Sequence, residues 1–235
     1  MRKITLVVPC RNEERGIGRV IDQINTEKLR QAGFTIEVLV VDNHSTDRTA
    51  QVAKEKGARI VTEPKTGKGN AIRTGFKNIS NDTDYVVMLD GDDTYKPYEM
   101  LRLVEPIDSG FADAIIGSRL DGKMNDRSMS MSHRLANWFF TFFVRQFYKA
   151  NVTDTCTGYF AWKKGVIDRL DGQIVSEGFA IETEMITKMA RLGFQIYSVP
   201  ITYDPRSGDS KLSPIGDGLR IIWMLIRNLA WKEKT

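Results

Sequence analysis

The chain has 235 residues, of which 41% are hydrophobic and 27% charged, and its formal net charge is +4 at pH 7. This length can bury one sizeable core and predicts a single domain over residues 1–235. Its two cysteines, Cys10 and Cys156, form no disulfide framework or zinc-ligand spacing, which favours a reducing compartment and excludes a disulfide-rich scaffold. The apolar run over residues 4–8 is too short for the core of a secretory signal peptide.

Short apolar runs alternate with helical patterns along the first half of the chain. We expect buried strands at residues 4–9, 36–41, 59–62, 86–89 and 113–118, and helices at 13–30, 47–56, 70–78 and 98–109. Ser45 or Thr46 is available to cap the second helix, and Pro97 suits the first turn of the fourth. Strands that alternate with helices predict an α/β fold, with a largely parallel sheet covered by helices on both faces.

Polar side chains gather directly after four of these strands. The strand at 86–89 runs into Asp90, Gly91, Asp92 and Asp93, and three others run into residues 10–14, 42–47 and 65–70. An open α/β sheet binds its ligand outside the carboxyl ends of its strands, so we expect a pocket there. Asp90 and Asp92 are candidate ligands for Mg²⁺ or Mn²⁺, which prefer oxygen and keep positions for substrate phosphates. Asp93 is expected to lie outside the coordination sphere.

Several motifs occur in an order that resembles family 2 glycosyltransferases. They are residues 9–14, 41–47, 67–69, 90–92 and 117–119. Three later segments, residues 154–159, 177–182 and 205–212, resemble the branch of dolichol-phosphate mannose synthases and polyprenyl-phosphate glycosyltransferases. The resemblance spans residues 4 to about 215. It implies the GT-A fold, a nucleoside-diphosphate sugar as donor, and inversion at the anomeric carbon.

The resemblance also implies which residues contact the donor nucleotide. These are Pro9, Arg11, Glu13, Asp42, Lys68, Asp90 and Gly91. Asp42 and Glu13 can accept hydrogen bonds from a base or ribose. Asn43 stands where many relatives carry an Asp and receives no acidic role, and Thr94 is not expected to be a direct metal ligand. The alternative for Lys68 is a solvated loop charge.

A second group of basic residues points to a phosphate on the acceptor. Arg119 and Arg134 correspond to acceptor-phosphate positions of that branch, with Asn137, Arg206 and Lys211 as further candidates. An arginine fork matches phosphate oxygens in geometry. We therefore expect Arg119 to contact the reacting phosphate.

The acceptor decides whether the site needs a general base. A phosphate monoester is mostly ionised at neutral pH, whereas a hydroxyl needs a carboxylate to take its proton. Asp154 is the leading candidate for that base, and with a lipid phosphate it would orient the acceptor or the donor sugar. Glu182 and Glu184 are two positions apart on a helix, so at most one can face the pocket. His44 and His133 have no partner pattern and are treated as non-catalytic.

Residues 119–149 are basic and rich in aromatic side chains. We expect interfacial helices at residues 132–149 and 215–231 that contact an anionic membrane surface, since rings and Lys or Arg stems settle there. Packing of the first helix into the core is the alternative. The apolar stretch 138–144 is far too short to span a bilayer. Nucleic acid is disfavoured as a partner because the acidic cluster is present and a dense basic patch is absent.

Together these patterns predict a metal-dependent, inverting glycosyltransferase at the cytoplasmic face of a membrane. Its donor would be a UDP- or GDP-sugar, and its acceptor a polyprenyl or dolichyl phosphate. Two alternatives stay open: a family 2 enzyme that uses a hydroxyl acceptor, and a non-catalytic nucleotide-sugar binding module. A nucleotidyltransferase is disfavoured because no Gly-rich, basic segment follows the first strand. A membrane-protein partner or a homo-oligomer also stays open.

Overall fold

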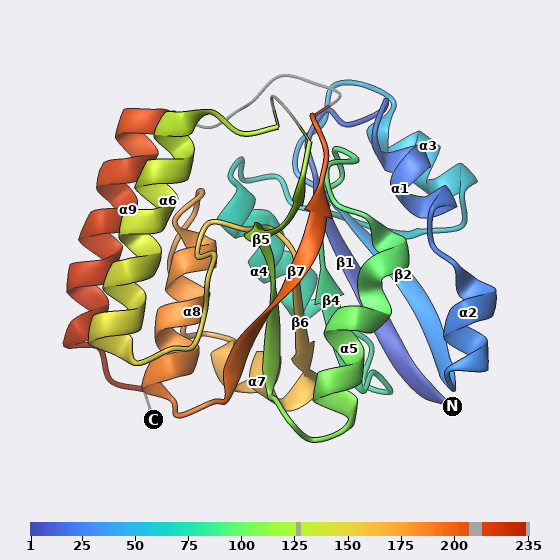
Figure 1. The fold of residues 1–235 in the computed structure, drawn as a ribbon. Helices are drawn as coiled ribbons and strands as arrows, with labels where there is room; N and C mark the ends of the chain where they lie inside the picture. The colour runs from blue at the N-terminus through green and yellow to red at the C-terminus, as the bar shows by residue number, and fades with distance from the viewer. Residues whose placement is uncertain (126–127, 207–212, 234–235) are drawn as a thin grey trace.

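The computed structural model describes residues 1–125, 128–206 and 213–233. Within these residues one seven-stranded sheet runs in the order β3-β2-β1-β4-β6-β5-β7 (Figure 1). The strands are β1 Arg2–Cys10, β2 Phe34–Asp42, β3 Arg59–Thr62, β4 Tyr85–Met88, β5 Ala114–Met124, β6 Phe160–Lys163 and β7 Ile196–Tyr203. Only β6 is antiparallel to its neighbours β4 and β5, so the predicted, largely parallel sheet is confirmed.

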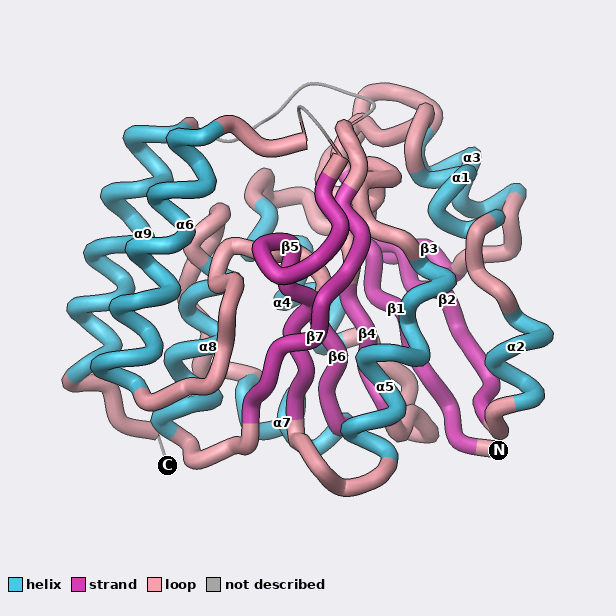
Figure 2. The backbone as a smooth tube through the Cα atoms, in the orientation of Figure 1, coloured by secondary structure: helices cyan, strands magenta, loops and turns pink. Residues whose placement is uncertain are grey.

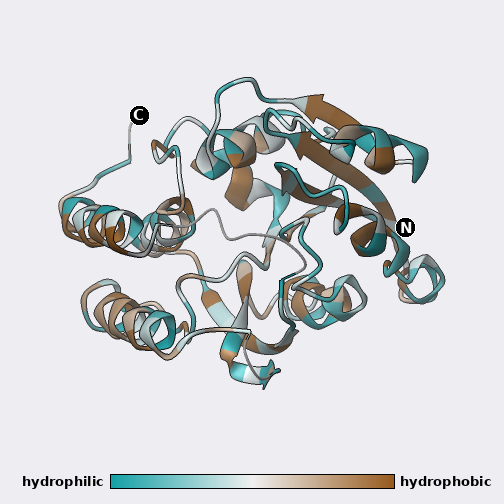
Figure 3. Cartoon of the chain, turned by 90° about the horizontal axis from the view of Figure 1, so that it is seen from above, coloured by the Kyte–Doolittle hydropathy of each residue, from teal (hydrophilic) through white to brown (hydrophobic). Residues whose placement is uncertain are grey.

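Helices cover both faces of this sheet, as Figure 2 shows. One face packs against α1 Ile17–Asp22, α2 Thr26–Gln31, α3 Thr49–Glu55 and α5 Met100–Asp108, the last preceded by a 3₁₀ turn at Pro97–Glu99. The other packs against α4 Lys68–Lys77, α6 Met131–Phe143, α7 Lys164–Leu170, α8 Ile181–Arg191 and α9 Pro214–Leu229. Successive strand residues point to opposite faces, which is why Val7 belongs to one core and Leu6 and Val8 to the other. Figure 3 shows the hydrophobic strands lying between the helices.

Three local predictions differ from the structure. The single helix expected at 13–30 is two helices, α1 and α2, because the Asn25 side chain accepts the backbone N–H of Lys28 and begins a new helix. Neither Ser45 nor Thr46 caps α3; the Asp47 carboxylate accepts the N–H of Thr49 instead. The strand expected at 113–118 extends to Met124, because it continues to pair with β7 after a register shift. The sequence patterns did not predict β6 or β7.

The basic aromatic segment lies at one side of the molecule. It forms α6 and a π-helical turn, Val144–Tyr148, and α9 packs beside α6 (Figure 1). Only some of its aromatic side chains are buried in the core. Phe140 and Tyr148 are buried, whereas Trp138, Phe139 and Phe142 are about half exposed. Among the described residues, no helix has the length and apolar character that crossing a membrane requires.

Candidate active site

Two adjoining cavities lie at the carboxyl ends of the strands. The larger has a volume of about 300 Å³ and the smaller about 140 Å³. They share four lining residues: Lys68, Asp90, Phe179 and Arg206. A ligand that occupies both would therefore pass the acidic residues that follow β4. This is the position that the parallel strands predict for a pocket.

The acidic turn after β4 separates its three carboxylates. Asp90 and Asp92 line the larger cavity. Asp93 has a left-handed backbone (φ 67°) and its carboxylate turns away, accepting hydrogen bonds from Arg19 and Gln23 at 2.7 and 2.6 Å. The structure thus keeps Asp93 out of the pocket, as expected. The Asp90 carboxylate lies against Gly158. Only glycine leaves room for it, since a Cβ at this position would lie 2.6 Å from Asp90 Oδ2.

Asp92 is almost fully buried and has two kinds of partner. Its Oδ1 accepts the Thr94 hydroxyl at 2.7 Å, and its Oδ2 lies 2.5 Å from the Arg206 guanidinium. Burial alone would raise the pKa of Asp92, but the charge of Arg206 and the hydrogen bonds from Thr94 outweigh it and lower that pKa. Asp92 is therefore held as a carboxylate, and hydrogen bonds from the N–H and hydroxyl of Thr94 fix its Oδ1.

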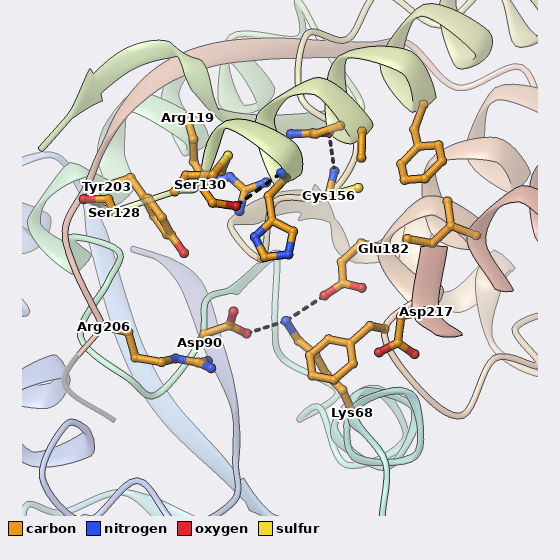
Figure 4. A pocket seen from close by; sticks show the side chains of 18 of the residues that line it. Lys68, Asp90, Arg119, Ser128, Ser130, Cys156, Glu182, Tyr203, Arg206 and Asp217 are labelled. Atoms are coloured by element: carbon orange, nitrogen blue, oxygen red, sulfur yellow. Dashed lines mark hydrogen bonds and ion pairs between the residues drawn. The ribbon is translucent and has the colours of Figure 1, made fainter. Parts of the chain in front are cut away.

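Lys68, the first residue of α4, is an internal cation. Its Nζ lies 2.7 Å from Asp90 Oδ1 and 2.6 Å from Glu182 Oε1, and Figure 4 shows it between the two carboxylates. Burial by itself would lower the pKa of Lys68, but these two negative charges raise it well above its usual value. Lys68 is thus not a solvated loop charge. For Glu182 the balance is different: burial raises its pKa, and the charge of Lys68 offsets this only in part.

The two glutamates of α8 face different ways. Glu182 lines the larger cavity, whereas Glu184 points into the protein, pairs with Lys188 at 2.5 Å and accepts the N–H of Ser176. One turn of helix cannot bring both to one face. The expectation that at most one of them serves the pocket is confirmed.

Arg119 comes from β5 and is held by Asp154. Its Nε and Nη2 donate to the two carboxylate oxygens of Asp154 at 2.8 and 2.9 Å, and its guanidinium stacks 5.2 Å from the Tyr203 ring centre. Arg119 lines the larger cavity, while Asp154 is fully buried and does not. Burial would lower the pKa of Arg119, but the Asp154 charge raises it well above its usual value. Among the described residues Arg119 donates to no other acceptor.

The smaller cavity collects the residues expected to contact a nucleotide. It is lined by Pro9, Arg11, Glu13, Lys68, Asp90 and Gly91. Asp42 does not line it, yet its Oδ1 is buried without a hydrogen-bond partner among the described residues. Asn43 also borders the cavity and orders the neighbouring loop, since its amide donates to two carbonyls and accepts the N–H of Gly67.

One candidate acceptor residue, Arg134, is not brought into the pocket. Arg134 is exposed on α6 and lines neither cavity. Its outward position follows from the helical period, because each residue is rotated by about 100° from the one before it and the preceding residue, His133, lines the larger cavity. Asn137 and Arg206 do line the larger cavity. Lys211 lies outside the described residues.

Comparison with known proteins decides the family. The family model described as "Glycosyl transferase family 2" matches residues 5–170. The chain belongs to this family.

Two of the curated family 2 proteins that the chain resembles carry names that refer to a glycan or to a lipid phosphate. The "Low-salt glycan biosynthesis hexosyltransferase Agl6" of Haloferax volcanii is 33% identical over 226 residues, which is 96% of this chain and 53% of that protein. The "Undecaprenyl-phosphate mannosyltransferase" of Micrococcus luteus is 31% identical over 224 residues, 91% of this chain and 88% of that protein. The chain thus spans about half the length of the first of these relatives.

Solved structures show the same fold. Glucosyl-3-phosphoglycerate synthase from Mycobacterium tuberculosis, in complex with Mn²⁺, UDP-glucose and glycerol 3-phosphate, superposes with a TM-score of 0.73. It is 23% identical, over 99% of this chain and 82% of that one. The predicted GT-A fold of this family 2 glycosyltransferase is confirmed.

The fold raises the question of a divalent ion, and the residues present fit one. The described residues contain no group of three or more His, Cys, Asp or Glu side chains suited to a metal. Mg²⁺ commonly binds through one or two carboxylates together with substrate phosphates, however, and Asp90 and Asp92 line one cavity. The donor set therefore suits an ion that shares its coordination with a phosphate-bearing ligand.

Several lining residues of this family 2 site were missed by the sequence patterns. Tyr95, Phe179 and Tyr203 line the larger cavity, and so does His133. The three aromatic residues lie inside or within three positions of recognised motifs, so proximity to a motif was the available signal. Asp217 and Ile221 also line it from α9, and no local pattern marks them.

Proposed function

We propose that this protein moves a sugar from a UDP- or GDP-sugar onto the phosphate of a polyprenyl or dolichyl lipid, with inversion and with Mg²⁺ or Mn²⁺. The observation that carries the proposal is Arg119, a buried guanidinium in the wall of the larger cavity that uses one edge for Asp154. Its remaining N–H groups can bind an anion in that cavity. The named activity of the Micrococcus relative supports a polyprenyl phosphate as that anion.

The donor would lie in the smaller cavity. Glu13 lines that cavity, and its carboxylate can accept hydrogen bonds from a base N–H or a ribose hydroxyl. Lys68 and Arg206, which line both cavities, lie where the diphosphate would pass between them. The UDP-glucose complex of the structural neighbour supports this class of donor.

Asp90 and Asp92 would hold the divalent ion. Bound there, it would act as a Lewis acid that stabilises negative charge on the departing diphosphate. Lys68 and Arg206 add two positive charges beside the same carboxylates, so the leaving phosphate would be neutralised from both sides.

The carboxylates of the larger cavity favour a phosphate acceptor over a hydroxyl. Four line it in the described chain, and each contacts a cation: Asp90 and Glu182 contact Lys68, Asp92 contacts Arg206, and Asp217 contacts Arg220. Taking a proton would remove the negative charge from each of these ion pairs, which disfavours a general-base role, for Glu182 too although burial raises its pKa. A phosphate that is already ionised needs no such base.

Membrane contact would bring the enzyme to its lipid. Large apolar side chains, at least 38% exposed, gather on α6, the π-helical turn and α9: Met131, Leu135, Trp138, Phe139, Phe142, Phe147, Ile215, Leu219, Ile222, Trp223 and Ile226. Exposed Arg134, Arg145, Arg220 and Arg227 accompany them. We propose that this α6–α9 surface, defined by these residues, contacts the anionic cytoplasmic face of a membrane.

The test is sugar transfer from a panel of UDP- and GDP-sugars to a short polyprenyl phosphate and, in parallel, to its dephosphorylated alcohol. We expect transfer to the phosphate alone, and loss of turnover when the divalent ion is chelated. Transfer to the alcohol alone would replace the proposal with a hydroxyl acceptor. Nucleotide binding without transfer to either would favour a binding module.

A further inference from the structure

Asp154 lies at the centre of a buried hydrogen-bond cluster. Its two oxygens accept from five donors: the N–H, Nε and Nη2 of Arg119, Nδ2 of Asn137 and the N–H of Cys156, at 2.7–3.2 Å. An ionised carboxylate offers roughly four lone-pair directions, so these donors occupy all of them. With no exposed surface and no cavity contact, Asp154 cannot reach a substrate.

Asn137 ties this cluster to α6. Its Nδ2 donates to Asp154 at 2.7 Å, and its Oδ1 accepts the N–H groups of Thr155 and Cys156 at 3.3 and 3.2 Å. Both ends of the amide are therefore engaged within the protein, and the residue is only 2% exposed. These contacts hold the segment that carries Asp154 against the helix, so the position of the carboxylate is set from two sides.

The consequence for Arg119 is a fixed orientation. A guanidinium is planar, and two parallel hydrogen bonds to one carboxylate set both its position and its plane. The Tyr203 ring, 5.2 Å away, covers its face. The donors that Asp154 does not use belong to the opposite edge, and Arg119 lines the larger cavity. Together these contacts hold the guanidinium with one edge on Asp154 and one face against Tyr203.

We propose that Asp154 and Asn137 are positioning residues that act through Arg119, presenting its outer edge to the acceptor phosphate, and that neither one takes a proton or binds the acceptor. This inference rests on the proposed function for the identity of the acceptor. It reassigns Asp154, which the sequence suggested as a base for a hydroxyl acceptor or as a residue that orients the acceptor or the donor sugar. It also reassigns Asn137, which the sequence suggested as a further acceptor-phosphate residue.

The first measurement needs no substrate. Arginine Nε–H resonances are recorded by ¹H–¹⁵N NMR, and that of Arg119 is assigned by its disappearance in Arg119→Lys. In Asp154→Asn we expect this resonance to shift and to lose its protection from solvent exchange, and in Asn137→Ala to change less in the same direction. An unchanged Arg119 resonance in Asp154→Asn would overturn the proposal.

Glu184→Gln is the matched control. Glu184 is likewise a fully buried carboxylate that pairs with a cation and accepts backbone N–H groups, but it lies outside both cavities. It should leave the Arg119 resonance in place. If Asp154→Asn does not fold, Asn137→Ala removes one of the five donors, keeps the ion pair and carries the same measurements.

The second measurement is steady-state transfer to a short polyprenyl phosphate across pH. Asp154→Asn should raise the half-saturating acceptor concentration about tenfold, the size expected when one hydrogen bond to a charged group is lost. The half-saturating donor concentration and the shape of the pH profile should not change. A lost acidic limb, with turnover lower by about 10²-fold or more, would make Asp154 a base and overturn the proposal.

The two measurements separate this inference from the proposed function. Asp154→Asn could shift the Arg119 resonance and weaken donor binding but leave the acceptor kinetics unchanged. Asp154 would then still position Arg119, but Arg119 would contact the donor. In that case the positioning of Arg119 by Asp154 stands and the contact of Arg119 with the acceptor phosphate fails. If the unchanged protein transfers no sugar to the polyprenyl phosphate, the proposed function fails instead, and the Arg119 resonance still tests the positioning.

Discussion

At the scale of a single residue, Asn43 illustrates how one amide orders a loop beside the smaller cavity. It is 3% exposed; its Nδ2 donates to the carbonyls of Glu63 and Lys65 at 3.1 and 2.8 Å, and its Oδ1 accepts the N–H of Gly67 at 2.7 Å. Gly67, with φ 140°, leads directly into Lys68. A side chain that both donates and accepts is needed here, and a carboxylate cannot donate.

Asn43→Asp should therefore weaken both stability and donor binding. The new carboxylate would face two carbonyl oxygens without a donor, which we expect to lower the free energy of unfolding by about 1–3 kcal/mol. Urea denaturation measures the loss, and calorimetric titration with UDP and GDP in Mn²⁺ measures the binding. Asn81→Asp makes the same change at an exposed position. Equal stability of the two variants would contradict the role given to Asn43.

At the scale of an element, α6 and α9 contribute residues both to the larger cavity and to an exposed apolar surface. Their inward residues Asn137, Phe140 and Ile221 line the larger cavity, and their outward residues form the α6–α9 surface. Among the described residues, no segment covers the outward apolar side chains of α6 and α9. The placement explains how a lipid surface and an acceptor cavity would meet at the same pair of helices.

The α6–α9 surface should bind anionic vesicles. We expect co-sedimentation with vesicles that contain phosphatidylglycerol, and less of it as salt rises, because exposed charges are screened. Trp223→Glu, at a side chain 57% exposed, should weaken binding about tenfold or more, since it removes an aromatic ring from the contact. Phe111→Glu changes a ring that is 62% exposed elsewhere and should have no effect. Equal binding of both variants and the unchanged protein would exclude this surface.

At the scale of the whole molecule, one cluster of ion pairs joins strands of the sheet away from the site. Glu37 on β2 pairs with Lys3 on β1 at 2.7 Å and with Arg59 on β3 at 2.6 Å, and it accepts the Ser80 hydroxyl. Burial alone would raise the pKa of Glu37, but these hydrogen bonds outweigh it and lower the pKa from 4.5 to about 2. The cluster joins three strands and lines neither cavity.

Glu37→Gln should lower stability without lowering transfer. Because the folded-state pKa is depressed, the contribution of Glu37 is fully present above pH 4.5 and disappears as pH falls toward 2. We expect a loss of about 1 kcal/mol at pH 7, given the partial exposure of the cluster, and a shrinking difference between the variants below pH 4.5. Urea denaturation at several pH values measures it. Glu27→Gln, in an exposed i,i+3 pair on α2, is the control and should change little.

Much of this arrangement follows from local patterns. Apolar runs that end in polar residues predict parallel strands with a pocket at their carboxyl ends, and Asp90, Lys68, Arg119 and Arg206 do line one cavity. Such predictions succeed because the two-residue period of a strand and the direction of a parallel sheet are properties of the chain itself.

Other features depend on contacts between distant segments. The family, the fold class and the carboxylates that follow each strand can all be predicted from the amino-acid sequence. The three-dimensional fold was needed to show that Asp154 holds Arg119, that Glu182 rather than Glu184 faces Lys68, and that Arg134 is exposed. The physical reason is that the rotation of each helix and the partner of each buried charge are set by packing against segments far along the chain, which local periodicity does not encode.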